Sequence, residues 1–517
     1  MIRKISLRLL PENMNDLSLI RQSAAQALTI PVEQIDAVQV FRRSIDARGR
    51  TPMMQLQVAV YMGEPIRELF QPILYQPVRP KKQVIIVGSG PAGLFAALRL
   101  IELGICPIVL DRGKNITDRR FDLKTLQTDG LVNPDSNYCF GEGGAGTYSD
   151  GKLYTRSTKR GDVSKILSVL VQHGATHDIL VNSHPHIGSN RLPGIIKHIR
   201  ETILASNGQV HFNSRVVDLV IKNQTLCGVR TEQDEWIADA VILAFGHSAR
   251  DMYQLLDRHN ILMEAKPFAM GVRVEHPQET INAIQYGSFK DSPHLPTAAY
   301  SLACQVDGAG VYSFCMCPGG MLVPAATAPG ELVLNGMSNS LRNLAHANAG
   351  LVVSIDSRVY GQFENFKHFA GLECQRQVEQ KAFYAGGKTQ AAPAQRMTDF
   401  LENRVSSSLP GTSYIPGVVS YDLKQVLGPY ISEHLKAGLK IFGQNMRGYL
   451  TNEASLLAVE SRTSSPVRIP RHSNTWMHPQ ISGLFPVGEG AGHAGGIVSS
   501  AIDGNGCADA VSRYLSY

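Results

Sequence analysis

One stretch constrains the fold of this chain more than any other, residues 83–113, QVIIVGSGPAGLFAALRLIELGICPIVLDRG. It begins with an apolar run typical of a buried strand and continues as a helix that starts at Pro91 and stops at Gly104. A second apolar strand, PIVLD, follows. This order is a βαβ unit with a G-x-G-x-x-G turn after its first strand. The sequence therefore predicts an α/β fold around a Rossmann-like sheet.

The glycine turn has the spacing of a dinucleotide site. Its first glycine permits the tight turn, its second lets the backbone approach a pyrophosphate, and its third lets the helix pack closely on the strand. The N-terminus of the helix favours the phosphate charge. Asp111, 18 positions after Gly93, is placed to bind ribose hydroxyls. The residues expected to bind the cofactor here are Gly88, Ser89, Gly90, Pro91, Ala92, Gly93, Asp111 and Arg112.

The acidic residue narrows the choice of cofactor. A carboxylate at the end of the second strand repels a 2′-phosphate, so NADP fits this site least well and FAD and NAD remain. Two distant segments bear on that choice. Residues 210–251 alternate as strands and close on the apolar run AVILAFGH, and residues 483–511 form a short strand, a glycine-rich turn and a helix of small residues. FAD is long, and binding it along its length requires chain elements that lie far apart in the sequence.

The order of these three segments resembles the two-domain flavoproteins of the glutathione-reductase and hydroxybenzoate-hydroxylase type. In those proteins the third segment brings an acidic side chain to the ribityl chain and a helix N-terminus to the isoalloxazine oxygen. The resemblance therefore implies FAD, with Glu489 and the amides of residues 495–498 in these roles. The further cofactor contacts that it implies are Val216, Ala244, Gly246, Gly488, Glu489, Gly496 and Ile497.

The chain is more specifically similar to a group of bacterial uncharacterised FAD-dependent dehydrogenases, related to the NAD(FAD)-utilising dehydrogenases. The segments that carry this similarity are residues 137–153, 266–278, 312–320, 460–469 and 488–504. Two positions depart from the usual flavoprotein pattern, which more often has Glu where Asp111 stands and Asp where Glu489 stands. Both exchanges keep the charge and alter the reach of the side chain.

A glycine-rich segment, GEGGAGTYSDGKL at residues 141–153, has five glycines in thirteen positions. Such a backbone can lie flat against a ring or a pyrophosphate, although a flexible surface loop has the same composition. We expect flavin contact from Gly143 and Gly144. Lys152 is a candidate for the charge at flavin N1 or at a phosphate.

The domain organisation follows from where these segments fall. Residues 1–78 are expected to form a small α+β module followed by a proline-rich linker, and residues 79–265 and 478–517 the two parts of the FAD-binding domain. Residues 266–477 then form an inserted domain, strand-like in its first half and helical in its second, that covers the flavin. The insert combines a mixed β-sheet with helices.

Two cysteines of the insert, Cys315 and Cys317, stand two apart in a strand-like run, so both thiols face one side. As a redox disulfide they are marginal, because an extended pair separates its α-carbons by about 6.6 Å. As zinc ligands they need two more, and only the histidines of residues 184–186 form a close pair, so no metal is expected. Packing in a tight sheet and a flavin-facing thiol are the other two interpretations.

Several basic side chains lie beside motif glycines or serines. An arginine next to a flavin commonly binds a substrate carboxylate in a bidentate manner, through two N–H groups of its planar, fork-shaped guanidinium. The ordinary role of an arginine is a surface salt bridge. Arg273 and Arg462 are the candidates for carboxylate binding. His247 and His493 adjoin flavin segments and are candidates for proton transfer, or are structural imidazoles.

The remaining sequence features restrict the class of protein. Eight cysteines without a C-x-x-C pair indicate reduced thiols and hence the cytoplasm, and no apolar run satisfies the length of a membrane span. A net charge of +6 without a long basic block gives little reason to expect nucleic acid; the densest basic stretch, residues 41–50, is expected to be a solvated hairpin.

The sequence thus predicts an FAD-dependent dehydrogenase that exchanges a hydride with a small organic substrate, an anion if the two arginines bind it. It has one G-x-G-x-x-G turn, so NAD(P)H would visit the flavin transiently as donor, or the substrate itself is the donor. The alternative is a flavin-containing RNA-binding or RNA-modifying protein that uses the N-terminal module. The pattern leaves the substrate and the oligomeric state open.

Overall fold

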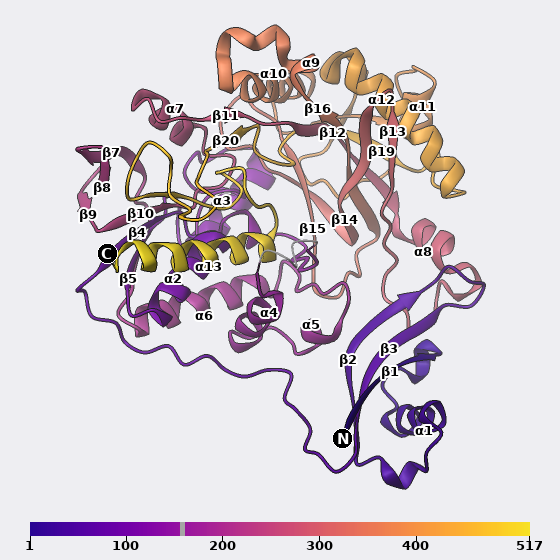
Figure 1. The fold of residues 1–517 in the computed structure, drawn as a ribbon. Coiled ribbons are helices and arrows are strands. Elements are labelled where there is room, and N and C mark those ends of the chain that lie inside the picture. Colours follow the sequence, from indigo (N-terminus) through magenta and orange to yellow (C-terminus); the bar gives the residue numbers. More distant parts are fainter. Residues whose placement is uncertain (156–160, 517) are drawn as a thin grey trace.

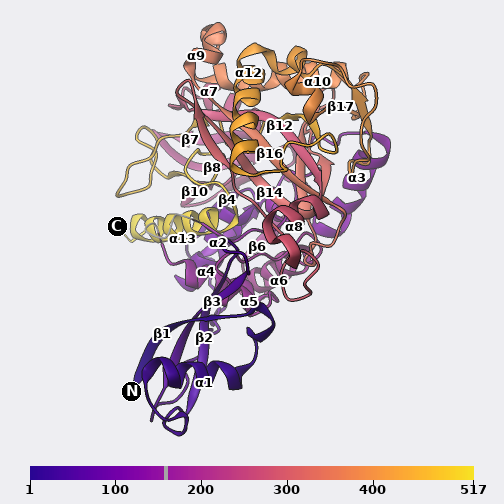
Figure 2. The ribbon, with the colours of Figure 1, turned by 90° about the vertical axis from the view of Figure 1, so that its right-hand side faces the viewer.

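A computed structural model describes residues 1–155 and 161–516 of the chain. The structure has three parts: a parallel-sheet layer with its helices, a large sheet covered by helices, and a small N-terminal module that projects from them (Figures 1 and 2). The first two parts are the two bodies of the molecule and lie directly against each other. The C-terminal helix returns to the parallel-sheet layer, so the chain leaves this layer and comes back to it.

The parallel sheet contains the predicted βαβ unit at its centre. In order across the sheet its strands are β21 (Leu484–Pro486), β10 (Ala240–Leu243), β4 (Gln83–Val87), β5 (Cys106–Leu110) and β6 (Gln209–His211). Strands β4, β5 and β10 are short, largely buried apolar runs, as the helices around a parallel sheet require, whereas the edge strand β6 is only partly buried. The three segments expected to bind FAD therefore supply three adjacent strands, β21, β10 and β4.

Helices and a small meander surround this sheet. The helices are α2 (Pro91–Glu102), α3 (Ile116–Asp129), α4 (Val163–Gln172), α5 (Asp178–Val181), α6 (Leu192–Ala205), α7 (Arg250–Arg258) and α13 (Ile497–Tyr514). The meander consists of β7 (Val216–Lys222), β8 (Thr225–Thr231) and β9 (Glu235–Ile237). Helices α2 and α13 pack along each other, so both begin at the same edge of the sheet (Figure 1).

The large sheet has eight strands. Its order is β13 (Ala303–Val306), β14 (Ala309–Pro324), β16 (His346–Ile355), β12 (Phe268–Pro277), β19 (Ser455–Glu460), β17 (Ala392–Arg396) and β18 (Val418–Ser420), with β15 (Leu334–Ser338) paired to β14. The helices of this region are α8 (Gln278–Tyr286), α9 (Ser357–Tyr360), α10 (Ala370–Ala385), α11 (Met397–Leu401) and α12 (Leu423–Asn445). A two-stranded ribbon, β11 (Glu264–Ala265) with β20 (Val467–Arg468), lies where the chain enters and leaves the sheet.

The N-terminal module contains β1 (Ile2–Leu9), α1 (Leu17–Leu28), β2 (Ala37–Asp46) and β3 (Met53–Tyr61), with β3 in the middle of an antiparallel sheet. This order of strand, helix, strand and strand is an α+β arrangement, the class that the sequence predicts for these residues. Helix α1 begins where Asp16 accepts a hydrogen bond from the backbone N–H of Leu19, an N-cap. The helix packs its apolar face on the sheet through Ile20 and Ala24.

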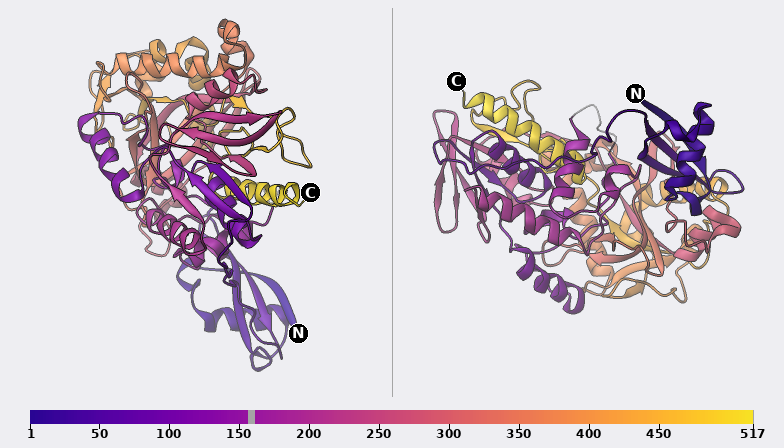
Figure 3. Two further views of the ribbon diagram at one scale, coloured as in Figure 1. Left: turned by 90° about the vertical axis from the view of Figure 1, so that its left-hand side faces the viewer. Right: turned by 90° about the horizontal axis from the view of Figure 1, so that it is seen from below.

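An extended segment, residues 63–82, joins the module to β4 and runs along the helices of the parallel-sheet layer (Figure 3). Gln172 of α4 holds it with two hydrogen bonds to the backbone of Ile73, at 2.9 and 2.8 Å. The module itself is held by the basic stretch. Arg43 pairs with Asp178 at 2.8 Å, and Arg42 donates to Ser183 at 3.0 Å.

The basic stretch does form the expected β2–β3 hairpin. Its arginines Arg43 and Arg42 also contact the parallel-sheet layer, Arg43 with a mostly buried side chain and Arg42 while it stays exposed to solvent. The sequence could not show this, because their partners follow more than 130 residues later in the chain. Across residues 1–155 and 161–516, none of the helices combines the length with the apolar character needed to cross a bilayer.

Candidate functional site

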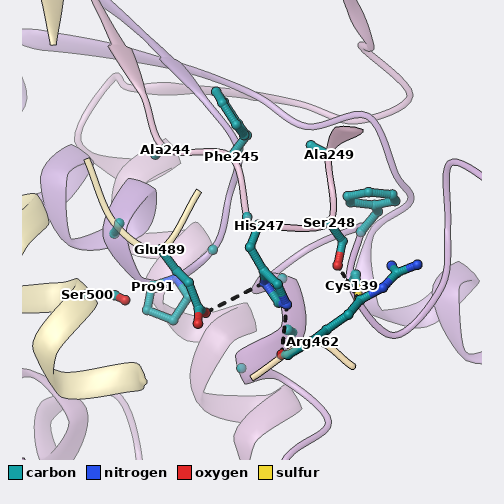
Figure 4. Close-up of a pocket in the computed structure, with 18 of the residues that line it drawn as sticks. Pro91, Cys139, Ala244, Phe245, His247, Ser248, Ala249, Arg462, Glu489 and Ser500 are labelled. Carbon is teal, nitrogen blue, oxygen red and sulfur yellow. Dashed lines mark hydrogen bonds and ion pairs between the residues drawn. The ribbon is translucent and has the colours of Figure 1, made fainter. Parts of the chain in front are cut away.

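A cavity of about 300 Å³ lies between the parallel sheet and the large sheet. At one end it is lined by the glycine turn after β4, and at the other by residues of the large sheet, among them Cys315, Asn335 and Glu460. Figure 4 shows its middle part, where Glu489 and His247 face each other across the space. The cavity therefore joins chain segments from both bodies.

The glycine turn is closed on its protein side and open on its cavity side. A Cβ at Gly93 would lie 1.9 Å from the carbonyl oxygen of Gly88, so only glycine lets α2 approach β4 this closely. A Cβ at Gly90 would meet nothing within 4 Å. This open face is the space that a pyrophosphate needs.

Two helices point their N-termini at the cavity. Helix α2 follows Gly90 and α13 follows Gly496; both of these residues line the cavity, and neither helix has a side chain capping its first turn. The unpaired N–H groups and the positive ends of the two helix dipoles suit an anionic diphosphate and an electron-rich ring oxygen. The residues present therefore fit FAD.

Asp111 lines the cavity, but its carboxylate is occupied by protein donors. It accepts hydrogen bonds from Ser89 N at 2.9 Å and Ser89 Oγ at 2.6 Å, and from the backbone N–H groups of Gly113 at 2.8 Å and Gly141 at 3.1 Å. Four bonds use the usual accepting capacity of a carboxylate. Asp111 thus ties the glycine turn to the glycine-rich segment, a structural role that the predicted ribose contact did not include.

Arg112 follows Asp111 at the same end of the cavity. It pairs with Asp135 at 2.7 Å and with Asp251 at 2.8 Å, and its guanidinium lies 4.4 Å from the centre of the Phe140 ring. The ion pairs hold its planar group against the cavity wall.

Most of the predicted site residues meet at the cavity. Those that line it are Gly88, Gly90, Pro91, Ala92, Asp111, Arg112, Gly144, Lys152, Val216, Ala244, Gly246, Cys315, Arg462, Glu489, Gly496 and Ile497. Those that do not line it are Ser89, Gly93, Gly143, Gly488, Cys317, Arg273 and His493. Several of the second group support the first: Gly143 donates to the Ser89 carbonyl at 3.0 Å, and Gly488 donates to Asp503 at 2.8 Å.

The two cysteines converge on Lys152. Its Nζ lies 3.9 Å from the Sγ of Cys315, 3.7 Å from the Sγ of Cys317 and 3.4 Å from an oxygen of Asp150. Cys315 is partly exposed to the cavity, whereas Cys317 is fully buried. One ammonium group therefore serves both thiols.

The expected regular strand is wrong at these cysteines. Strand β14 loses its register with β16 between Phe314 and Cys317, and Cys315 has a left-handed backbone with φ of 45°. Such a bulge re-aims side chains, so the thiols meet through a local kink rather than through regular alternation. The extended geometry that made a disulfide marginal is consequently absent.

The charges around the pair favour a thiolate at Cys315. A hydrogen bond with Cys317 is the main cause that lowers the pKa of Cys315 well below its usual value, and Lys152 and Arg273 lower it further. Burial opposes the charged form of Lys152, but the neighbouring thiols and Asp150 outweigh it and raise the pKa of this ammonium group.

Arg273 is not presented to the cavity, contrary to the prediction. It is fully buried in β12 and forms an ion pair with Glu460. Its remaining N–H groups donate to Asn335 at 3.0 Å, to Asn348 at 3.2 Å and to the carbonyl of Cys315 at 3.2 Å. Arg273 thus holds the bulge from behind and has its fork filled by protein acceptors.

Arg462 lines the cavity, but its fork is also filled. It pairs with Glu379 and Glu331 at 3.0 Å each and donates to Thr327 at 2.6 Å. Arg250 of α7 binds the same two carboxylates, at 2.9 and 3.0 Å. Burial alone would raise the pKa of Glu379, but the two arginines lower it to about 2. This four-charge cluster joins the parallel-sheet layer to the large sheet, so its arginines bind protein carboxylates where a substrate carboxylate was expected.

Two titratable groups meet in the middle of the cavity (Figure 4). His247 contacts the carbonyl of Arg462 through Nε2 at 3.0 Å, and its Nδ1 lies 3.8 Å from Glu489. Burial lowers the pKa of His247 to about 4 and raises that of Glu489 to about 7. His493 instead contacts the carbonyl of Ile469 at 3.0 Å, outside the cavity lining, and burial lowers its pKa to about 4.

Two buried acids that line the cavity were not among the predicted site residues. Asp150 pairs with Arg342 at 2.6 Å and with Lys152, and Glu460 pairs with Arg273. Both belong to segments that carried the family resemblance, SDGKL and ESRTSS, and this was the available signal. Within the described ranges, no three His, Cys, Asp or Glu side chains gather closely enough to hold a metal ion.

Comparison with protein families agrees with this geometry. Residues 81–120 match an FAD binding domain, residues 267–463 match the C-terminal domain of FAD-dependent proteins, and residues 1–61 match a domain of unknown function. FAD is therefore the cofactor, as the sequence predicts, and the protein is an FAD-dependent flavoprotein with an α/β fold.

Comparison with individual proteins gives one full-length relative. An uncharacterised protein of Clostridium beijerinckii is 40% identical in an alignment of 511 positions that covers 95% of this chain and 95% of the relative. Among solved structures, CtdE in complex with FAD and a substrate is 12% identical, covers 84% of this chain and 85% of its own, and has a TM-score of 0.33. A geranylgeranyl bacteriochlorophyll reductase-like protein from Thermoplasma acidophilum is 12% identical over 84% and 79% of the two chains, with a TM-score of 0.32. These structural similarities are too remote to carry an argument.

Proposed function

The chain belongs to the same family as the uncharacterised Clostridium beijerinckii protein, and we propose that it is an FAD-dependent dehydrogenase that exchanges a hydride with a small organic substrate. One observation carries the proposal: a single cavity connects the glycine turn with Lys152 and Cys315. A narrower membership, among relatives of the NAD(FAD)-utilising dehydrogenases, is part of the same proposal and rests on the five segments named above.

Different residues of the cavity are proposed to bind different parts of FAD. The open face of Gly90 and the N-terminus of α2 receive the diphosphate. The N-terminus of α13 and Glu489 also line the cavity and would receive the ribityl and ring portions. FAD bound in this way supplies the hydride chemistry, and the protein supplies orientation and electrostatics.

The large sheet supplies the rest of the reaction site. Asn335, Glu460 and Cys315 line the end of the cavity opposite the glycine turn. Glu489 can hold or release a proton near neutral pH because burial raises its pKa to about 7, whereas His247 stays neutral there. Glu489 is therefore the group best placed to exchange a proton in step with hydride transfer.

An anionic substrate remains part of the proposal, but its recognition shifts to another residue. The forks of Arg273 and Arg462 are filled, whereas the side chain of Lys152 is 37% exposed and lines the cavity. We assign the attraction of a substrate anion to Lys152. NAD(P)H, if it is the donor, visits the same space transiently, because the chain has one dinucleotide turn.

The domain division of residues 1–78, 79–265, 266–477 and 478–517 is likewise a proposal, supported by the separate sheets. All eight cysteines are free thiols, and this supports a reducing compartment, the cytoplasm. The RNA alternative gains no support, since Arg42 and Arg43 already hold the module in place.

An anaerobic screen tests the proposed function. The FAD-loaded protein is mixed with NADH, NADPH and a panel of small metabolites while the flavin absorbance is followed. We expect one donor to bleach the flavin, and we expect Glu489→Gln to slow this reduction without releasing FAD. The proposal would be contradicted if none of the compounds bleached the flavin, although they bind and although dithionite still reduces it.

A further inference from the structure

The two thiols beside Lys152 differ in their exposure to the cavity, although both lie within contact distance of its ammonium group. Cys315 lines the cavity, whereas Cys317 is fully buried directly behind it. The bulge of β14 brings the two sulfurs to 3.9 and 3.7 Å from the Nζ of Lys152, and the thiol of Cys317 donates to the backbone carbonyl of Cys315 at 3.3 Å. Of these two sulfurs, a molecule in the cavity can therefore touch only that of Cys315. Cys139 is another thiol that lines the cavity.

This asymmetry is what thiol–disulfide exchange requires. The attacking thiol must be accessible and ionised, and the second thiol must reach the first without competing for the substrate. A nucleophile acting on a carbonyl would have no use for a buried second thiol. Arg273 adds to the arrangement because it donates to the carbonyl of Cys315 and so fixes the bulge.

We infer that Cys315 and Cys317 are an attacking and a resolving thiol that reduce a small organic disulfide entering the cavity. The inference deepens the proposed function, on which it rests for the identity of the site, by naming a substrate class. The disulfide must be small because Cys315 opens into a cavity of about 300 Å³ that also has to hold FAD.

The exchange proceeds in two steps. The thiolate of Cys315 attacks one sulfur of the substrate, the substrate S–S bond breaks, and the first thiol leaves with a proton from the ammonium group of Lys152, 3.9 Å from Cys315. Cys317 then loses its proton and attacks the Sγ of Cys315; the mixed disulfide breaks, and the second thiol leaves with that proton. The substrate gains two electrons and two protons, and the two cysteines become a disulfide. A single turnover needs no other reductant.

The test is a single-turnover reaction of the reduced, FAD-loaded protein with one equivalent of dithiodipyridine, an aromatic disulfide whose thiol product is coloured. We expect a fast phase that releases both halves of the probe, and a protein two hydrogens lighter that retains no probe by mass spectrometry. Cys317→Ser should release one half and keep the other on Cys315. Cys315→Ser should lose the fast phase.

Two further variants separate this site from background thiols. Lys152→Met should slow the fast phase about tenfold at pH 7 and recover at alkaline pH, because the thiolate fraction of Cys315 falls without the ammonium group. Cys304→Ser is the matched control: Cys304 lies on β13 beside β14, burial raises its pKa, and it does not line the cavity. Its loss should leave the fast phase unchanged.

A parent protein that keeps half of the probe on Cys315 would overturn the inference, as would a fast phase that survives in Cys315→Ser. Neither result depends on a donor for the flavin. If a donor bleaches the flavin but no resolved exchange occurs, the inference fails and the proposed function stands. If both halves are released but no donor bleaches the flavin, the proposed function fails.

Discussion

The two ends of the cavity are built in different ways. At the glycine turn, six consecutive residues, 88–93, form the site with their backbone. The close packing of this backbone is possible because its glycines have no Cβ atom. At the large sheet, Cys315 depends on Lys152, which lies 163 positions earlier in the sequence, and on Arg273 on another strand. A binding site made by consecutive backbone groups can be recognised in one segment of the sequence. A site made by side chains depends on partners that only the fold brings together.

The largest effect is expected at the cluster that joins the two bodies. Arg462→Met removes one of two cations from a pair of buried carboxylates, and we expect it to lower the free energy of unfolding by about 3–5 kcal/mol. Urea denaturation followed by flavin fluorescence measures this. Arg358→Met is the control, since Arg358 is 60% exposed in its pair with Asp356 and should change stability by less than about 0.5 kcal/mol. Equal stability of the two variants would show that the cluster does not hold the bodies together.

The glycine turn offers a matched pair of substitutions. Gly93→Ala places a Cβ 1.9 Å from the carbonyl of Gly88, and we expect roughly 3 kcal/mol of destabilisation in the apoprotein. Gly90→Ala meets no protein atom within 4 Å, so the apoprotein should keep its thermal midpoint while FAD affinity falls. Thermal unfolding and FAD titration separate the two effects. If Gly90→Ala binds FAD like the parent, the diphosphate lies elsewhere.

Glu489 should make stability depend on pH. Its folded pKa of about 7 exceeds the ordinary value of 4.5, so the folded state binds more protons between these values and stability falls as pH rises from about 5 to about 8. Because this side chain is 27% exposed, we expect a loss of only about 1–2 kcal/mol. Thermal midpoints of the apoprotein at pH 5 and pH 8 measure it, and Glu489→Gln should remove this part of the fall. An unchanged pH dependence in Glu489→Gln would assign the fall to other groups.

The smallest effect concerns the N-terminal module. Arg43→Ala removes its ion pair with Asp178, and we expect faster trypsin cleavage within residues 63–82 with less than about 1 kcal/mol lost overall. Arg48→Ala is the control, because Arg48 is 91% exposed beside Asp46 of its own hairpin. Equal cleavage rates in both variants would mean that Arg43 does not hold the module.

The same comparison explains what the sequence could predict. The βαβ unit, the three flavin segments, and the strands of the first half of residues 266–477 follow local patterns, and FAD follows from them. The second half was expected to be helical; it contains helices α10 and α12, but also strands β17, β18 and β19 of the large sheet, which were missed. The filled forks of Arg273 and Arg462 could not be predicted, because their carboxylate partners come from other elements. The bulge at Cys315 was missed for a related reason: period-two alternation describes a regular strand, and nothing in the residues around Cys315 marks the register shift.

The proposed function requires that one cavity place the flavin ring beside Cys315. An anaerobic pH titration of the long-wavelength flavin absorbance tests it, with the FAD-loaded parent and Cys315→Ser measured side by side. The account predicts a charge-transfer band that grows as pH rises through the pKa of Cys315, well below the usual value of 9.0, and that is absent in Cys315→Ser. An FAD-loaded parent without such a band at any pH, with a spectrum identical to that of Cys315→Ser, would contradict it.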